Sequence, residues 1–320
     1  MGIQKNNCKE IMMNILGASS FVTRFKFMKV LAVCLVLSAL PVMAQNQTLY
    51  IESGVMSVNG AGGADLDVWG FTTEAGSNPM IPGPAIEATE GDTVTVRIVN
   101  NHDRSHNFSI PKMNISVNIP AGGSQNVTFT ASDSGIFLYN DNNQVNKSMG
   151  LYGQVTIRPP TAGAAWTEGP AFDNERTWVV SDMDKANWND VASSGGSVNT
   201  SAYNPNYFLL NGQGGFDAMH DPNTVADGAV GDTYLIRIAN AGQLAQSLHY
   251  HGAHLQVISR NGQRLSTPEW QDTINVKPGE TMMVLYKLRG GIFPMHIHTA
   301  QMETANGVYL NGTATLLVGN

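Results

Sequence analysis

The sequence predicts an all-β protein made of two tandem Greek-key β-sandwich domains. Apolar material suffices for two cores, because hydrophobic residues make up 42% of the 320 residues and charged residues only 13%. Turn-forming residues are plentiful, with 33 Gly and 14 Pro, and the chain lacks long helical tracts rich in Ala, Leu, Glu and Lys. Motifs that recur at an offset of about 140 residues indicate a duplicated domain.

The N-terminal segment has the features of a leader that precedes the folded protein. Residues 28–44 read MKVLAVCLVLSALPVMA, with a Lys, a short apolar run and small residues near the end. This pattern is typical of a secretory signal peptide, and the apolar run is short for a membrane span. We expect residues 1–44 to be the signal peptide, with residues 1–27 as an over-extended gene start. The mature protein is then expected in the periplasm or outside the cell.

Charge and cysteine usage exclude several classes of function. Without residues 1–44 the chain keeps 13 Lys and Arg against 24 Asp and Glu, a net charge of −11. Such a chain offers no basic patch, so we expect no nucleic-acid partner, and we expect no membrane span after signal cleavage. Both cysteines, Cys8 and Cys34, lie in the leader, which excludes disulfides and thiolate chemistry from the mature protein.

Strand motifs recur in the same order in the two halves of the chain. Residues 91–100 read GDTVTVRIVN and residues 231–240 read GDTYLIRIAN, and each predicts a strand that follows a Gly-Asp turn. Two further matches follow in order, residues 135–137 with 291–293 and residues 150–152 with 307–309. Two copies of this length favour two self-contained sandwiches over a solenoid, which needs more repeats.

The repeats also place the domain boundaries. We expect domain 1 at residues 46–160 and domain 2 at residues 176–320. The linker is expected at residues 161–175, directly after two prolines. Residues 184–206 are rich in Asn, Ser and Gly and are expected to form a long loop.

Histidines gather in two short segments of domain 2. One segment contains His249, His251 and His254, and the other contains His296 and His298. Because residues i and i+2 of a strand point to the same face, each His-x-His motif projects two imidazoles to one side. If the two segments are neighbouring strands, four imidazoles come within several Å of one another. Neutral imidazole is a good ligand for copper and zinc, so the pattern predicts a metal site.

The expected metal ligands are His249, His251, His296 and His298. Copper is the expected metal, and zinc is the alternative because four imidazoles also suit a tetrahedral site. His254 falls on the opposite face of a regular strand, so it either supports a ligand from behind or lies on the surface. Met295 and Met302 offer thioether sulfur to Cu(I), although core packing explains both as well.

Three further motifs carry a family resemblance. They are PGP at residues 82–84 with EGDT at 90–93, LHYHG at residues 248–252, and GIFPMHIH at residues 291–298. In these motifs the chain resembles the multicopper oxidases and the two-domain copper nitrite reductases, over nearly all of its length after the leader. The resemblance implies two cupredoxin-like domains, a copper cofactor, and oxidoreductase activity on a small-molecule or metal-ion substrate.

Several residues depart from the pattern of that family. Ile297 stands where the type 1 copper Cys is expected between the last two His, and Gln246 replaces a His. His106 matches the type 1 His of domain 1, but Ser109 and Pro111 stand where domain 2 has its first His pair. We therefore expect no type 1 copper and a metal-free domain 1, with His106 as a polar residue at its end.

Three functions stay open at this point. The first is a copper oxidoreductase whose four domain-2 histidines are half of the trinuclear ligand set of the family, with Asp141 and Glu303 as candidate proton donors. The second is a non-enzymatic protein that buffers or delivers copper in the cell envelope. The third is a metal-free scaffold for protein interactions. In the two-domain relatives a neighbouring subunit completes the ligand set, so the resemblance also suggests a homotrimer.

Overall fold

Strands dominate the part of the chain that the computed structural model describes, residues 44–320. The predicted signal peptide lies outside this part, except that Ala44 begins the first strand. Within residues 44–320, no helix combines the length and the apolar character that crossing a membrane requires. The all-β fold class is confirmed.

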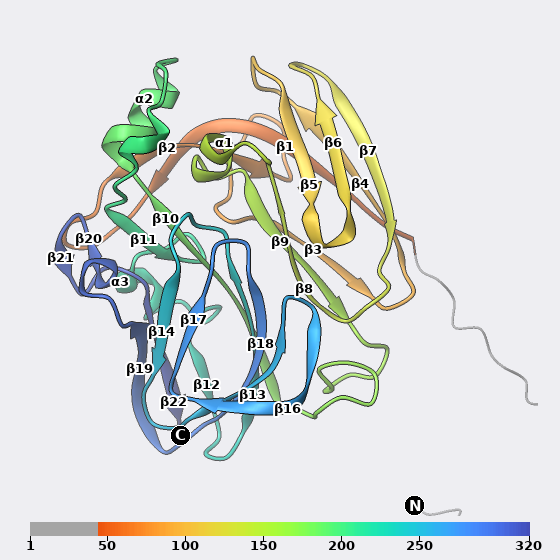
Figure 1. The fold of residues 1–320 in the computed structure, drawn as a ribbon, viewed down its shortest axis with the longest axis vertical. Coiled ribbons are helices and arrows are strands. Elements are labelled where there is room, and N and C mark those ends of the chain that lie inside the picture. Colours follow the sequence, from red (N-terminus) through yellow and green to blue (C-terminus); the bar gives the residue numbers. More distant parts are fainter. Residues whose placement is uncertain (1–43) are drawn as a thin grey trace, which may run out of the picture. The chain divides into compact units, whose positions relative to one another are not determined.

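Domain 1 is a sandwich of two sheets. Its strands are β1 (Ala44–Ser57), β2 (Asp65–Thr72), β3 (Gly83–Thr89), β4 (Thr93–Asn100), β5 (His106–Ile110), β6 (Ile115–Ile119), β7 (Ser124–Thr130), β8 (Gly135–Asn140) and β9 (Tyr152–Arg158). Its short helices are η1 (Pro111–Met113) and α1 (Gln144–Ser148). One sheet has the order β2-β1-β4-β7 and the other has the order β3-β9-β8-β5-β6 (Figure 1).

Domain 2 is built in the same way with additional elements. Its strands are β10 (Asn174–Met183), β11 (Tyr207–Leu210), β12 (Ala226–Gly228), β13 (Thr233–Asn240), β14 (Gln246–Tyr250), β15 (Leu255–Arg260), β16 (Gln263–Gln271), β17 (Thr273–Val276), β18 (Thr281–Lys287), β19 (Gly291–Ile297), β20 (Thr304–Ala305), β21 (Val308–Tyr309) and β22 (Ala314–Gly319). Its short helices are η2 (Lys185–Asn189), α2 (Asp190–Ser193), η3 (Thr200–Ala202), α3 (Gly215–Ala218) and η4 (Ala300–Glu303). The sheets have the orders β16-β15-β18-β13-β10-β11-β20-β21 and β12-β22-β19-β14-β17.

The repeat in the sequence corresponds to a repeat in topology. In the first sheet of each domain, β1 pairs with β4 and β10 pairs with β13, both in parallel. In the second sheet, β3 pairs with β9 and β12 pairs with β22, again in parallel. The antiparallel partners also correspond, because β4 pairs with β7 as β13 pairs with β18. Domain 2 differs in that its first sheet is extended at both edges, by β15 and β16 next to β18 and by β20 and β21 next to β11.

The repeated sequence motifs do the same structural work in both domains. The Asp of each Gly-Asp turn accepts a hydrogen bond from the backbone N–H three residues earlier, at 2.9 Å in domain 1 and 3.0 Å in domain 2. Asn100 and Asn240, which end the two strands, are buried. The Nδ2 of Asn240 donates to the carbonyls of Leu244 and Val276, both at 2.8 Å, and Asn100 makes the equivalent bonds. Each Asn therefore holds the loop that follows its strand.

Apolar residues form a core in each sandwich and a third core between them. We call this third core the interdomain seam. Its buried members are Val58, Leu66, Val68, Ile136, Leu138 and Tyr152 from domain 1, with Ala165, Val179, Met183, Tyr207, Leu209, Leu235, Ala239, Ala241, Ile258, Met283 and Ala305. Burial of apolar side chains from both domains in one cluster stabilises the sandwiches against each other.

An ion-pair network also joins the two domains. Arg237 of β13 has a fully buried side chain, and its guanidinium donates to the carboxylate of Glu175. Glu175 also accepts from Arg158 of domain 1 at 2.7 Å. Burial by itself would raise the pKa of Glu175, but the charge of Arg237 and the hydrogen bonds from both arginines outweigh burial and lower it.

Candidate metal centre

The two His-x-His segments lie on neighbouring strands of domain 2. β14 and β19 pair in antiparallel fashion, with His249 directly opposite His296. Along both strands the apolar residues alternate with the histidines and are buried, as Leu248 and Ile297 are. Because side chains alternate between the faces of a strand, this burial turns the imidazoles to the other face.

The structure brings together the four histidines that were expected from the sequence. We call His249, His251, His296 and His298 the histidine set. The ring centroid of His249 lies 4.7 Å from that of His251, 5.6 Å from that of His296 and 4.8 Å from that of His298. The ring of His296 lies 5.2 Å from that of His251 and 5.9 Å from that of His298. Metal binding by this set stays a prediction.

Neighbouring side chains fix the orientation of two of these rings. The Nδ1 of His249 lies 2.8 Å from the Oγ1 of Thr273 in β17. The Nδ1 of His296 lies 2.7 Å from the Oε1 of Glu303 in η4, so this ring donates its Nδ1 proton to a carboxylate. Such a contact holds the other nitrogen, Nε2, without a proton and in a set direction. The Nε2 of His296 lies 3.1 Å from the Nε2 of His251.

The donor set fits a transition metal that prefers imidazole. Partial loss of hydration, and then the neighbouring histidines, lower the pKa of the largely exposed His251, which favours the neutral ring that metals bind. Two nitrogens 3.1 Å apart can share one ion at the metal–nitrogen bond length of about 2.0 Å. Among residues 44–320, no three His, Cys, Asp or Glu side chains are arranged to hold one ion together. The set therefore offers the nitrogen pair of His251 and His296 rather than a closed cage.

The remaining predicted residues lie outside this ring cluster. His254 is exposed and lines a cavity of about 800 Å³, together with Trp270 and Arg289. Met295 is fully buried in the core of domain 2. Met302 is buried beside Phe208 and Ile297, where it packs against the back of the second His-x-His segment. Both methionines pack in apolar clusters, and their contact with Cu(I) stays a prediction.

Two family models, each described as multicopper oxidase, match residues 70–162 and residues 183–311. The chain belongs to the multicopper oxidase family. The two matched stretches fall in domain 1 and in domain 2, so this multicopper oxidase family member carries the family pattern in both of its sandwiches.

Curated relatives of this multicopper oxidase family member are copper oxidoreductases at low identity. L-ascorbate oxidase from Cucurbita maxima is 28% identical over 245 residues, which cover 66% of this chain and 42% of that protein. Laccase-25 from Oryza sativa subsp. japonica is 26% identical over 225 residues, which cover 65% and 39%. The chain therefore spans about two fifths of the length of these relatives.

Solved structures match the fold over most of both chains. The blue copper oxidase from Nitrosomonas europaea has a TM-score of 0.73 at 21% identity, covering 86% of each chain. The copper nitrite reductase from Nitrosomonas europaea has a TM-score of 0.67 at 19% identity, covering 87% of this chain and 94% of that one. These matches confirm the predicted architecture of two cupredoxin domains.

Proposed function

We propose that this protein is an exported copper oxidoreductase that binds copper through the histidine set of domain 2 and works without type 1 copper. The observation that carries the proposal is the pairing of β14 with β19, which gathers four imidazoles on one face. No Cys follows residue 44, so a type 1 centre with a thiolate ligand cannot form in the mature chain.

The residues around the set have separate roles in this proposal. Glu303 and Thr273 hold the rings of His296 and His249 by their Nδ1 atoms, which leaves both Nε2 atoms available. The side chains of His251 and His298 are exposed, so a small substrate can approach the set from solvent. Copper bound there supplies one-electron chemistry that amino-acid side chains lack.

The direct test is metal content and Cu(II) electron paramagnetic resonance on protein purified from the periplasm. We expect copper in the wild type, with a type 2 signal and no intense blue band. The His249→Ala/His296→Ala variant is expected to lose it, whereas His220→Ala, which removes an exposed imidazole elsewhere in domain 2, keeps it. A wild type that binds no copper even after reconstitution, or a double variant that binds as much, would overturn the proposal. If the purified protein retains zinc and no copper, zinc is favoured as the metal of the site.

A copper carrier is the second candidate function, and the exposure of His251 and His298 favours it. Accessible ligands allow rapid exchange of an ion, which a carrier needs and an enzyme does not. Oxygen consumption with phenolic or metal-ion reductants separates the two functions. Turnover that disappears in the His249→Ala/His296→Ala variant supports the enzyme. Copper transfer to a chelator within seconds, without turnover, supports the carrier.

The proposed copper site also has a consequence for the oligomeric state. We propose a homotrimer in which a neighbouring copy covers the open side of the histidine set, since the described residues supply one nitrogen pair rather than a closed site. Light scattering on the copper-loaded protein measures the mass directly. A monomer that retains full copper binding would refute the trimer and leave the copper site itself standing.

A further inference from the structure

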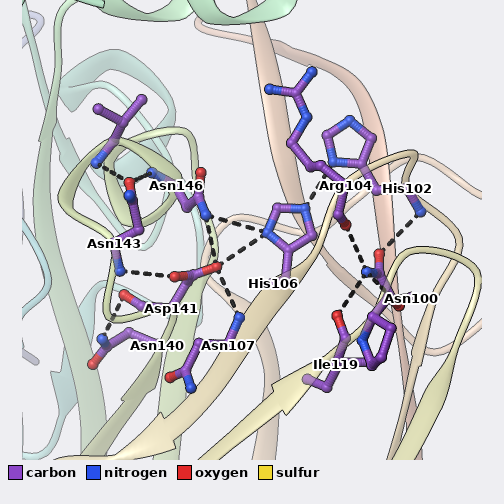
Figure 2. A network of polar contacts seen from close by, with 12 residues as sticks. Asn100, His102, Arg104, His106, Asn107, Ile119, Asn140, Asp141, Asn143 and Asn146 are labelled. Atoms are coloured by element: carbon purple, nitrogen blue, oxygen red, sulfur yellow. Dashed lines mark hydrogen bonds and ion pairs between the residues drawn. The ribbon is translucent and has the colours of Figure 1, made fainter.

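Domain 1 contains a line of hydrogen-bonded side chains that the proposed copper chemistry does not use. His106, at the start of β5, has its Nδ1 3.0 Å from the Oδ2 of Asp141, which follows β8. Its Nε2 lies 2.8 Å from the Nδ1 of His102 (Figure 2). The side chains of His106 and Asp141 are 0% and 2% exposed, and that of His102 is 11% exposed. The line therefore runs from a buried carboxylate toward the surface.

The partners of Asp141 determine where the protons of this line lie. Three donors besides His106 surround its carboxylate: Asn107 N at 3.1 Å, Asn143 N at 2.8 Å and Asn146 Nδ2 at 2.9 Å. We place the proton of His106 on Nδ1, because the carboxylate of Asp141 at 3.0 Å is a closer partner for that nitrogen than the Nδ2 of Asn146 at 3.4 Å, and Asp141 then acts only as an acceptor. The Nε2 of His106 then accepts from the Nδ1 of His102. The Nε2 of His102 keeps its lone pair at the outer end, 3.5 Å from the Oδ1 of the exposed Asp103, whose charge stabilises a proton taken up there.

His102 opens on a cavity of about 820 Å³. Its lining includes the carboxylates of Asp67, Asp103 and Asp190 and the guanidinium of Arg104. The excess of carboxylates disfavours an anionic ligand and favours a neutral or cationic one. Hydroxyl groups suit such a lining, because they donate to carboxylates and accept from a guanidinium.

We propose that His102, His106 and Asp141 form a general-base site in domain 1, which takes a proton from a neutral or cationic hydroxyl-bearing ligand, water included, bound in this cavity. The ligand O–H bond breaks and its proton binds the Nε2 of His102. The Nδ1 proton of His102 passes to the Nε2 of His106. The ligand becomes an alkoxide or hydroxide, His106 becomes an imidazolium beside the carboxylate of Asp141, and no electron changes hands.

The line matters because His102 alone is a poor base. Burial, then the nearby His106 and Arg104, lower the pKa of His102 to about 4, and Asp103 and Glu52 offset this only in part. A positive charge left on His102 would face these same costs. Passing the proton inward places the charge on His106, where Asp141 compensates it. His102 is thus the catalytic residue, and His106 and Asp141 are positioning residues.

Diethyl pyrocarbonate, which acylates unprotonated imidazole nitrogen, tests the line directly on the full-length protein. Peptide mapping gives the acylation rate of each histidine in the wild type and in Asp141→Asn. We expect the rate at His102 to fall about tenfold, the factor for losing a hydrogen bond to a charged acceptor. The exposed His220, whose Nδ1 donates to the carbonyl of Phe216 at 2.7 Å, is the internal reference and keeps its rate.

Two further measurements keep the proposal open to refutation. His106→Gln interrupts the line without changing Asp141, so it should also slow His102 if Asp141→Asn fails to fold. In the wild type, His102 should still react at pH 5, where an imidazole of ordinary pKa near 6.5 is mostly protonated. An unchanged rate in both variants would mean that the contacts are structural only.

The ligand class has its own test. Hydrolysis of the neutral ester 4-nitrophenyl acetate uses water as the hydroxyl ligand, and we expect His102→Gln and Asp141→Asn each to lower its rate at least about tenfold. The assay runs on copper-free protein, so its result does not depend on the domain-2 site. Equal hydrolysis by the wild type and both variants would overturn the general-base role.

Discussion

Replacing Glu303 by Gln isolates the contribution of one carboxylate to copper binding. The Oε1 of Glu303 lies 2.7 Å from the Nδ1 of His296, and the two side chains are only 17% and 16% exposed. Gln keeps the size and an acceptor oxygen but removes the charge. Hydrogen bonds to charged groups contribute about 1.5–3 kcal/mol, and loss of such a partner behind a metal-binding imidazole typically weakens affinity by about 10–100-fold.

We therefore expect the dissociation constant for Cu(II) to rise by about 10–100-fold in Glu303→Gln. Competition against a chelator of known affinity measures this constant. Glu269→Gln is the matched control, because Glu269 is also in domain 2 but is 47% exposed and pairs with Arg260. Its copper affinity should equal that of the wild type.

Two results would refute this reasoning about Glu303. One is a change in copper affinity of less than about threefold, which would mean that the carboxylate does not act through His296. The other is a large loss of stability in the metal-free variant. The hydrogen bond itself contributes about 1.5–3 kcal/mol to folding, so a larger loss would show that Glu303 holds η4 in place instead.

Three further predictions concern stability. Glu175→Gln leaves the buried Arg237 without its anion, and denaturant titration at pH 7 should show a loss of about 3 kcal/mol in the free energy of unfolding. Because the pKa of Glu175 is lowered in the fold, its contribution to stability is full above about pH 4.5 and falls as acid protonates the carboxylate. The stability difference between the wild type and the variant should therefore shrink at pH 3. Asn240→Ala removes both hydrogen bonds that its side chain donates to the loop after β13 and should lower the free energy of unfolding by about 2–3 kcal/mol. Asn100→Ala should give a similar loss of stability, and Asn101→Ala, at an exposed neighbouring position, a far smaller one. Copper at a hundred times its dissociation constant should stabilise the protein by about 2.7 kcal/mol. An unfolding temperature that is the same with and without copper would contradict a binding site in the native state.

The histidine set was predictable because its signal is local. A two-residue spacing places two rings on one face of a strand. The repeat of the whole domain indicates that the strands follow one another in the same order in both halves. The alternation of Leu248 and Tyr250 with the histidines of β14 is visible in the sequence and matches the burial observed.

The side chains that contact the histidine rings could not be predicted from the sequence as hydrogen-bond partners of those rings. Glu303 was expected only as a proton donor, and its contact with His296 depends on how η4 folds back after β19. His106 and Asp141 were both noted, but they are 35 residues apart and meet only because β5 and β8 pair. Such contacts arise from tertiary structure, for which a single sequence carries no periodic signal.

The Asn- and Ser-rich segment at residues 184–206 shows another limit of sequence reasoning. It was expected as a loop, and it contains the short helices η2, α2 and η3. Trp188 anchors it as a fully buried side chain, and the carboxylate of Asp184 accepts from the backbone of Asn187 at 3.0 Å. Composition favoured a loop, whereas capping and one buried aromatic residue decided the local structure.

The interdomain seam makes each domain depend on the presence of the other. The buried surface that domain 1 contributes to the seam gives it a role whatever it binds. Here its deletion would strip Leu138 and Tyr152 from the seam and leave the facing surface around Leu235 and Met283 open to water. Selection on the solubility of domain 2 therefore also preserves domain 1. A domain that is kept for its buried surface can also carry a further polar cluster, such as the line that ends at His102, without loss of the fold.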